Sequence, residues 1–215
     1  MSAPSNTTSI APSRRLVRRT SQLFAGLVLY GVGMALMVES RLGLTSWDVF
    51  HQGLSEVTGL SFGLVVILLG IPILLLWIPL RQRPGFGTVA NIVVIGVVVD
   101  AALAVSPAPE ALWLRIGYLV AGILVIGIGT GLYIGADFGP GPRDGLMTGL
   151  VSRFPRLSIR LVRTAIELSV LGTGWLMGGT VGLGTVAFAL AIGPLAQLFI
   201  PFFTVGAEPA TATAH

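Results

Sequence analysis

The sequence predicts an all-α, polytopic membrane protein: six transmembrane helices, arranged as two copies of a three-helix unit inserted in opposite orientations. The 215-residue chain is 53% hydrophobic and 10% charged, with a mean hydropathy of +0.89, so it has too little polar surface to cover a soluble globule. Apolar residues also fill all faces of long segments, unlike the single apolar stripe of a soluble helix. Finally, the chain matches itself when shifted by 96 or 97 residues.

Six apolar segments are long enough to cross a hydrocarbon layer about 30 Å thick, which takes roughly 17 to 25 helical residues. They are residues 22–38, 61–80, 88–105, 112–136, 159–177 and 184–203. They form a first three-helix repeat over 21–105 and a second over 111–203. The flanks are rich in Ser, Thr, Pro and Ala, which predicts a disordered basic N-terminal tail, 1–20, and a disordered C-terminal tail, 204–215.

The repeat depends on spaced glycines and an aspartate, which apolar helices do not share by chance. At an offset of 96, the matched residues include Gly31 with Gly127, Gly43 with Gly139 and Asp48 with Asp144. At an offset of 97, a Gly-x-Gly-Thr-Val-Ala run at 85–90 matches 182–187. Since each repeat holds three spans, the second starts on the opposite side of the membrane from the first.

The distribution of arginine independently supports the inversion. Four arginines within residues 14–19 place the N-terminus in the cytoplasm by the positive-inside rule. Segment 39–59 then lies outside, with three acidic residues and one arginine, whereas its counterpart 137–158 lies inside with three arginines. With six spans, the C-terminus is expected in the cytoplasm as well.

Two segments between the first and second span of each repeat, 42–59 and 139–156, are too long for tight connections and too apolar for plain loops. Each predicts a chain break followed by a short helix with an aspartate, Asp48 or Asp144, in its first turn. These aspartates either stabilise the helix start or belong to a functional site. The helices either lie in the membrane interface or are re-entrant, with their broken ends meeting near the midplane. The break and first-turn residues are Gly43, Trp47, Gly139, Pro142 and Arg143.

Ionisable residues inside the spans need an explanation, because each costs about 2.5 to 3.5 kcal/mol at a helix centre. Glu167 follows Arg163 by one helical turn, so the two either neutralise each other or contact a substrate. Asp100 has no cation in its own segment, and its repeat counterpart, Gln197, is also polar. The predicted substrate or ion pathway therefore comprises Asp48, Asp144, Asp100, Glu167, Arg163 and Asn91.

Several other chemistries are not expected. The chain has no cysteine and two histidines, which argues against thiol chemistry, a metal site or a bound cofactor. No nucleotide-binding motif or catalytic triad is evident, so no enzymatic activity is expected. Most arginines flank apolar segments, so we expect the lipid bilayer as partner and no nucleic acid.

The ordered motifs resemble a known family. They are Trp-Asp-Val-Phe-His at 47–51, Gly-x-Gly-Thr at 85–88 and 182–185, and Pro-Arg-Asp-Gly-Leu at 142–146. With these, residues 31–199 resemble the YczE/YyaS/YitT group of bacterial membrane proteins. The resemblance implies a bacterial cytoplasmic-membrane protein and no particular activity. That family tends to place Pro before Trp-Asp, where this chain has Ser46.

The inverted repeat, the paired breaks and the intramembrane carboxylates favour a small-solute or ion transporter. The alternative is a non-transporting membrane scaffold or regulatory protein. A bundle of this size can also pair in the membrane, so a homo-oligomer remains open.

Overall fold

The computed structural model describes residues 12–154 and 156–204, so the expected disorder of residues 1–11 and 205–215 lies outside the described residues. Within these ranges the chain forms eight α-helices and no strand. The helices are α1 (Pro12–Ser40), α2 (Ser46–Thr58), α3 (Phe62–Trp77), α4 (Phe86–Val105), α5 (Leu112–Gly135), α6 (Pro142–Arg153), α7 (Ile159–Leu176) and α8 (Leu183–Phe203).

The helices follow the predicted segments closely. The six apolar segments became α1, α3, α4, α5, α7 and α8, and the two intervening segments became the short helices α2 and α6. One boundary differs: residues 12–20, assigned to the disordered tail, are the start of α1. This part of α1 is held in place by Arg19, which binds the end of α5.

Length and composition identify a multi-pass membrane protein. Four helices, α1, α4, α5 and α8, are long and apolar enough to cross a membrane, and α2 with α3 would make a fifth span that is bent by 109°. Alone, α3 has only 16 residues, and α7 carries three charged residues in 18. Within the described residues, length and composition therefore support four or five spans.

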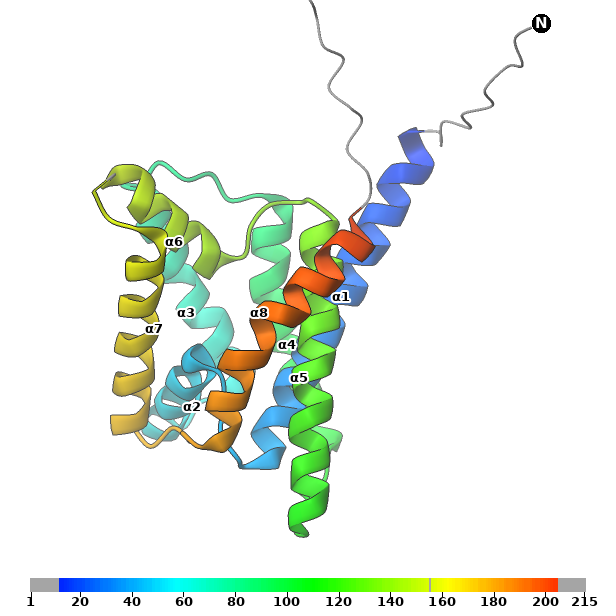
Figure 1. Ribbon diagram of the computed structural model, residues 1–215, viewed down its shortest axis with the longest axis vertical. Coiled ribbons are helices and arrows are strands. Elements are labelled where there is room, and N and C mark those ends of the chain that lie inside the picture. Colours follow the sequence, from blue (N-terminus) through cyan, green and yellow to red (C-terminus); the bar gives the residue numbers. More distant parts are fainter. Residues whose placement is uncertain (1–11, 155, 205–215) are drawn as a thin grey trace, which may run out of the picture.

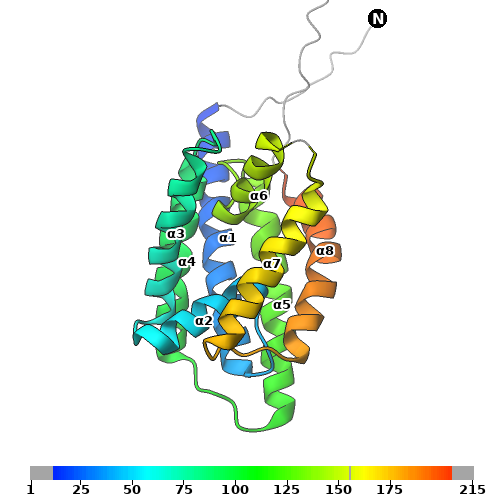
Figure 2. The same cartoon turned by 90° about the vertical axis from the view of Figure 1, so that its left-hand side faces the viewer.

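Corresponding helices of the two halves of the chain run in opposite directions. In Figure 1, α1 and α4 run downward whereas α5 and α8 run upward, with α2 at the lower end and α6 at the upper end. Figure 2 shows α3 and α4 on one side of the α1–α5 pair, and α7 and α8 on the other. The start of α1 and the end of α8 lie at the same end, where Gln22 Nε2 donates to the Phe203 carbonyl at 2.8 Å.

Each short helix packs on a long helix of the other half: α2 on α7, and α6 on α3. Glycines permit both contacts. A Cβ on Gly145 of α6 would lie 2.0 Å from the Trp77 ring of α3, and one on Gly174 of α7 would lie 2.5 Å from the Phe50 backbone of α2. The halves therefore interlock and share one core along α1 and α5.

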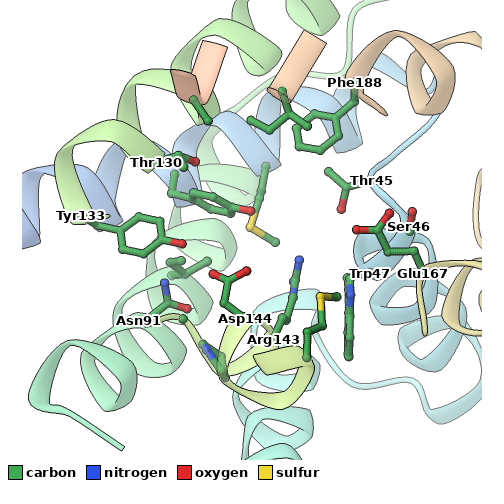
Figure 3. A pocket seen from close by; sticks show the side chains of 18 of the residues that line it. Thr45, Ser46, Trp47, Asn91, Thr130, Tyr133, Arg143, Asp144, Glu167 and Phe188 are labelled. Atoms are coloured by element: carbon green, nitrogen blue, oxygen red, sulfur yellow. The ribbon is translucent and has the colours of Figure 1, made fainter. Parts of the chain in front are cut away.

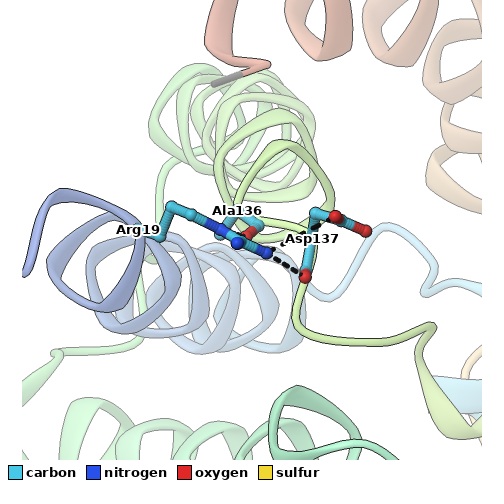
Figure 4. Close-up of polar contacts among 3 residues, drawn as sticks. All are labelled: Arg19, Ala136 and Asp137. Atoms are coloured by element: carbon cyan, nitrogen blue, oxygen red, sulfur yellow. Dashed lines mark hydrogen bonds and ion pairs between the residues drawn. The ribbon is translucent and has the colours of Figure 1, made fainter. Parts of the chain in front are cut away.

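Reciprocal arginines hold the ends of the central pair (Figure 4). Arg19 Nε of α1 donates to the Ala136 carbonyl at the end of α5 at 2.8 Å, and the same guanidinium binds Asp137. At an offset of 96, Arg115 of α5 donates to the Ser40 and Arg41 carbonyls at the end of α1, at 2.8 Å each. Each arginine thus satisfies carbonyl groups that the end of a helix leaves without a partner.

The Gly-x-Gly-Thr motifs make a second reciprocal contact. The Gly87 N–H at the start of α4 donates to the Phe138 carbonyl at 2.9 Å, and the Gly184 N–H at the start of α8 donates to the Leu42 carbonyl at 2.8 Å. Each motif therefore binds the chain break of the other half. At these breaks Gly43 and Gly139 have φ of 122° and 112°, which only glycine adopts without strain.

Candidate functional site

A cavity of about 570 Å³ lies between the two halves, and every helix of the described chain contributes to its lining. This volume is typical of small-molecule sites, which measure about 300 to 1,000 Å³. Figure 3 shows polar side chains from α2, α4, α6 and α7 gathered around it. The cavity is therefore the candidate functional site.

The starts of α2 and α6 reach this cavity from opposite ends of the molecule. Thr45, Ser46 and Trp47 line it from the first break, and Gly141, Pro142 and Arg143 line it from the second. The first turns are largely buried, whereas the last residues of α2 are exposed. Both helices thus begin inside the protein and end at its surface, and α2 lies at 109° to the α3 helix that follows it. The N-termini of α2 and α6 carry partial positive charge at the cavity.

Asp48 links the two broken helices. It is 1% exposed, and its Oδ1 lies 3.3 Å from His51 Nδ1 and 3.6 Å from Arg143 Nη2 of α6. The Arg143 guanidinium also stacks on the Trp47 ring, 5.0 Å from its centroid. Trp47 and Arg143 are repeat counterparts, so this stack lies at the junction of the two halves.

Two buried polar atoms of this cluster have no hydrogen-bond partner among the residues described: Asp48 Oδ2 and Trp47 Nε1. Trp47 lines the cavity and is 7% exposed. A buried donor without a partner costs about 1 to 3 kcal/mol, so the Trp47 indole N–H is a local cost to stability.

Arg163 and Glu167 form the predicted local pair on α7, with 2.9 Å between Nε and Oε1. Both line the cavity, and so do Asp144 and Asn91. Asp144 is accessible within the cavity, where the Tyr133 hydroxyl lies beside it (Figure 3). The structure thus gathers Asp144, Glu167, Arg163 and Asn91 around one space, with Asp48 directly behind Arg143.

Asp100 lies elsewhere. Its carboxylate accepts hydrogen bonds from Ser61 Oγ at 2.5 Å and from the Gly63 N–H at 2.6 Å, and it does not line the cavity. Both donors belong to the start of α3, where a carboxylate satisfies free N–H groups. The observed position is therefore a helix cap from a neighbouring helix, which sequence alone did not suggest.

The aromatic lining of the cavity was not predicted from the sequence. Tyr30 of α1 and Tyr133 of α5 pack edge to face, with 6.2 Å between ring centroids, and both line the cavity together with Phe188 of α8. Two tyrosines within apolar spans were the available signal, since their hydroxyl groups require polar surroundings.

The described residues contain no group of three His, Asp or Glu side chains placed to hold a metal ion. The side chains that line the cavity offer charges, hydrogen-bonding groups and aromatic rings to a ligand.

Fold and site together define an integral, multi-pass helical membrane protein with a polar cavity between two interlocked halves. Residues 17–201 match the model of the family of unknown function DUF6198. The chain belongs to this family and to the YczE/YyaS group of membrane proteins, which confirms the resemblance predicted from the motifs.

Three relatives are similar over most of their length. An uncharacterized protein of Haemophilus influenzae is 43% identical over 180 residues, covering 84% of this chain and 82% of the relative. The uncharacterized membrane protein YczE of Bacillus subtilis is 34% identical over 190 residues, covering 87% and 88%. The uncharacterized protein YyaS of Bacillus subtilis is 26% identical over 180 residues, covering 82% and 89%. No solved structure matches the chain.

Proposed function

We propose that the protein is a small-solute or ion transporter of the bacterial cytoplasmic membrane and that the central cavity is its substrate site. One observation carries this proposal: two broken helices enter the cavity from opposite ends of the molecule and bring charged and polar side chains to it. Transporters with inverted repeats bind their substrates at such a junction, near the midplane and at half-helix N-termini. A catalytic role is not part of this proposal.

The proposal includes six spans in two inverted repeats, with both termini in the cytoplasm. Its support comes from the opposite directions of the two halves (Figure 1) and from the reciprocal contacts of Arg19 and Arg115. In this arrangement α3 and α7 count as spans. Two of the three charged residues of α7, Arg163 and Glu167, line the cavity, and α3 follows α2 after a bend of 109°.

Transport is tested by an uptake and export screen in proteoliposomes with small solutes and ions. Wild-type protein is compared with Asp144→Asn and Glu167→Gln, which change cavity carboxylates, and with Glu56→Gln, which changes an exposed carboxylate of α2 outside the cavity. We expect flux for wild type and Glu56→Gln, and reduced flux for the cavity variants. Absence of flux with every solute, or equal flux in all variants, would overturn the proposal and favour a scaffold or regulatory protein.

Topology has its own test, because the chain has no cysteine. Single cysteines at Glu56 and Ser152, exposed positions related by the 96-residue offset, are labelled with a membrane-impermeant maleimide in intact cells. We expect Glu56→Cys to react from outside and Ser152→Cys to react only after permeabilisation. Labelling of both from the same side would refute the inversion.

A further inference from the structure

We infer that the cavity binds an amphipathic organic cation, an alkylammonium, whose charged group lies at Asp144 and whose hydrocarbon part lies along α8 in an opening between α7 and α8. The inference deepens the transport proposal, on which it rests, by giving the chemical class of the substrate. Three observations lead to it: the charge balance of the cavity, the aromatic rings near Asp144, and a difference between the two repeats.

The first observation is the charge balance. Around the cavity, the two arginines each contact a carboxylate other than Asp144: Arg143 faces Asp48 at 3.6 Å, and Arg163 binds Glu167 at 2.9 Å. Among the described residues, Asp144 has no ion-pair partner. Counting His51 as neutral, three carboxylates and two guanidinium groups leave one negative charge among the side chains, which the partial positive charge of the α2 and α6 N-termini reduces. A carboxylate without an ion pair of its own attracts a cation into the space beside it.

The second observation is the kind of side chain that shares the cavity with Asp144. Tyr133 lies beside it (Figure 3), and Tyr30 and Phe188 also line the cavity. Aromatic faces attract ammonium groups, most strongly where water is excluded. Alkylated ammonium groups fit such surroundings better than a metal ion, because they demand few hydrogen bonds and no ordered set of oxygen ligands.

The third observation is a difference between the two repeats in how their second and third helices pack. In the first, α3 packs against α4: a Cβ on Gly63 would lie 1.9 Å from the Gly96 carbonyl, and one on Gly70 would lie 2.5 Å from Ile92. At the 97-residue offset, these two glycines of α3 are replaced in α7 by Arg160 and Glu167. The helix face that closes the first repeat is therefore charged in the second.

As a result, α7 and α8 diverge from the connection they share (Figure 1) instead of packing along their length. The counterpart of Gly96 is Gly193 of α8, which is exposed and has no atom within 4 Å of a built Cβ. Gly193 also lines the cavity, so the wall of α8 that lacks α7 as a packing partner belongs to the cavity. Small and apolar side chains of α8 continue along the same wall: Ala189, Ile192, Ala196 and Ile200.

An opening at this place faces the hydrocarbon layer in the proposed topology. A molecule that enters there needs an apolar part that follows the α8 wall and a charged part that reaches the carboxylate. Arg163 and Glu167 line the opposite wall, and their mutual ion pair leaves no net charge to repel a passing cation. These features together select a cation with a hydrocarbon chain over a compact inorganic ion.

The test uses purified full-length protein in lipid nanodiscs, with tetramethylammonium and the butyl, hexyl and octyl trimethylammonium ions as probes. Alkyl sulfonates of the same chain lengths serve as anionic controls, and binding is measured by ligand-dependent thermal stabilisation. We expect the ammonium ions to bind more tightly as the chain lengthens. We expect Asp144→Asn to weaken their binding by about tenfold or more, equivalent to about 1.4 kcal/mol, and Glu56→Gln to leave it unchanged.

A second pair of variants tests whether the hydrocarbon chain lies along α8, in the opening between α7 and α8 (the groove). Gly193→Leu fills the open space on the α8 wall, whereas Gly117→Leu adds the same side chain at an equally open glycine of α5 outside the cavity. Gly193→Leu should remove the dependence on chain length and spare tetramethylammonium, and Gly117→Leu should behave like wild type.

Equal binding of sulfonates and ammonium ions, or unchanged binding in Asp144→Asn, would overturn the cationic class. Chain-length dependence that persists in Gly193→Leu would overturn the groove. Either result leaves the transport proposal standing if the flux screen finds another solute, so the two failures are distinguishable.

Discussion

The paired arginine caps lead to the sharpest stability prediction. Arg115 donates two hydrogen bonds of 2.8 Å to the last carbonyls of α1, and Arg19 holds the end of α5 in the same way (Figure 4). Replacing Arg115 with alanine leaves these carbonyls without a partner. A hydrogen bond from a charged donor contributes about 1.5 to 3 kcal/mol. Because Arg115 is half-buried, we expect a total loss of about 2 kcal/mol, below the sum of two fully buried bonds.

The assay is reversible unfolding in mixed detergent and SDS micelles, followed by circular dichroism. Arg19→Ala should cost nearly as much as Arg115→Ala, because the two arginines occupy matching positions. The double variant should lose the sum of the two within about 0.5 kcal/mol, since the sites lie at opposite ends of the bundle. Arg18→Ala, an exposed arginine on the same helix as Arg19, is the matched control. A loss for Arg115→Ala no larger than for Arg18→Ala would refute the reasoning.

Three further predictions concern packing, capping and backbone conformation. In Gly145→Val, the added Cβ would lie 2.0 Å from Cζ2 of the Trp77 ring. Thermal unfolding should therefore show that the free energy of unfolding falls by about 1 to 3 kcal/mol because of overpacking. An unchanged unfolding midpoint would contradict the packing of α6 on α3. Asp100→Asn should lower stability by about 1 kcal/mol, because it weakens the cap of α3. The flux per folded molecule should stay unchanged. A loss of flux without a loss of stability would show that Asp100 does belong to the substrate pathway. Gly43→Ala forces a side chain onto a backbone with φ of 122° and should cost about 1 to 3 kcal/mol, whereas Gly117→Ala should be nearly neutral; equal effects would refute the strain argument.

Local features of this fold could be predicted from the sequence. Hydrophobicity located the six long helices, the glycines marked the breaks that the positive φ of Gly43 and Gly139 confirm, and helical spacing paired Arg163 with Glu167. These features depend on residues within a few turns of each other, so local composition and periodicity are enough to predict them.

Contacts between distant parts of the chain could not be predicted in the same way. Nothing in the pattern around Asp100 indicates that it caps α3, or that Arg143 of α6 faces Asp48 of α2. Each depends on which helices become neighbours, and the preference of α2 for α7 over its own following helix is a property of the assembled halves. The Arg19–Arg115 match, however, was present in the sequence at the 96-residue offset, upstream of the part of the repeat that the glycines revealed.

The interlocking of the halves has a consequence for biogenesis. When α1 to α4 have emerged from the ribosome, the Leu42 carbonyl, the Gly87 N–H and the end of α1 still lack partners, because all three partners belong to residues 115–184. The first half must therefore remain loosely associated, or shielded by the insertion machinery, until α8 begins to enter the membrane. The same reciprocity means that each half supplies hydrogen-bond partners to the ends of the other half, so neither half is expected to reach its final structure alone.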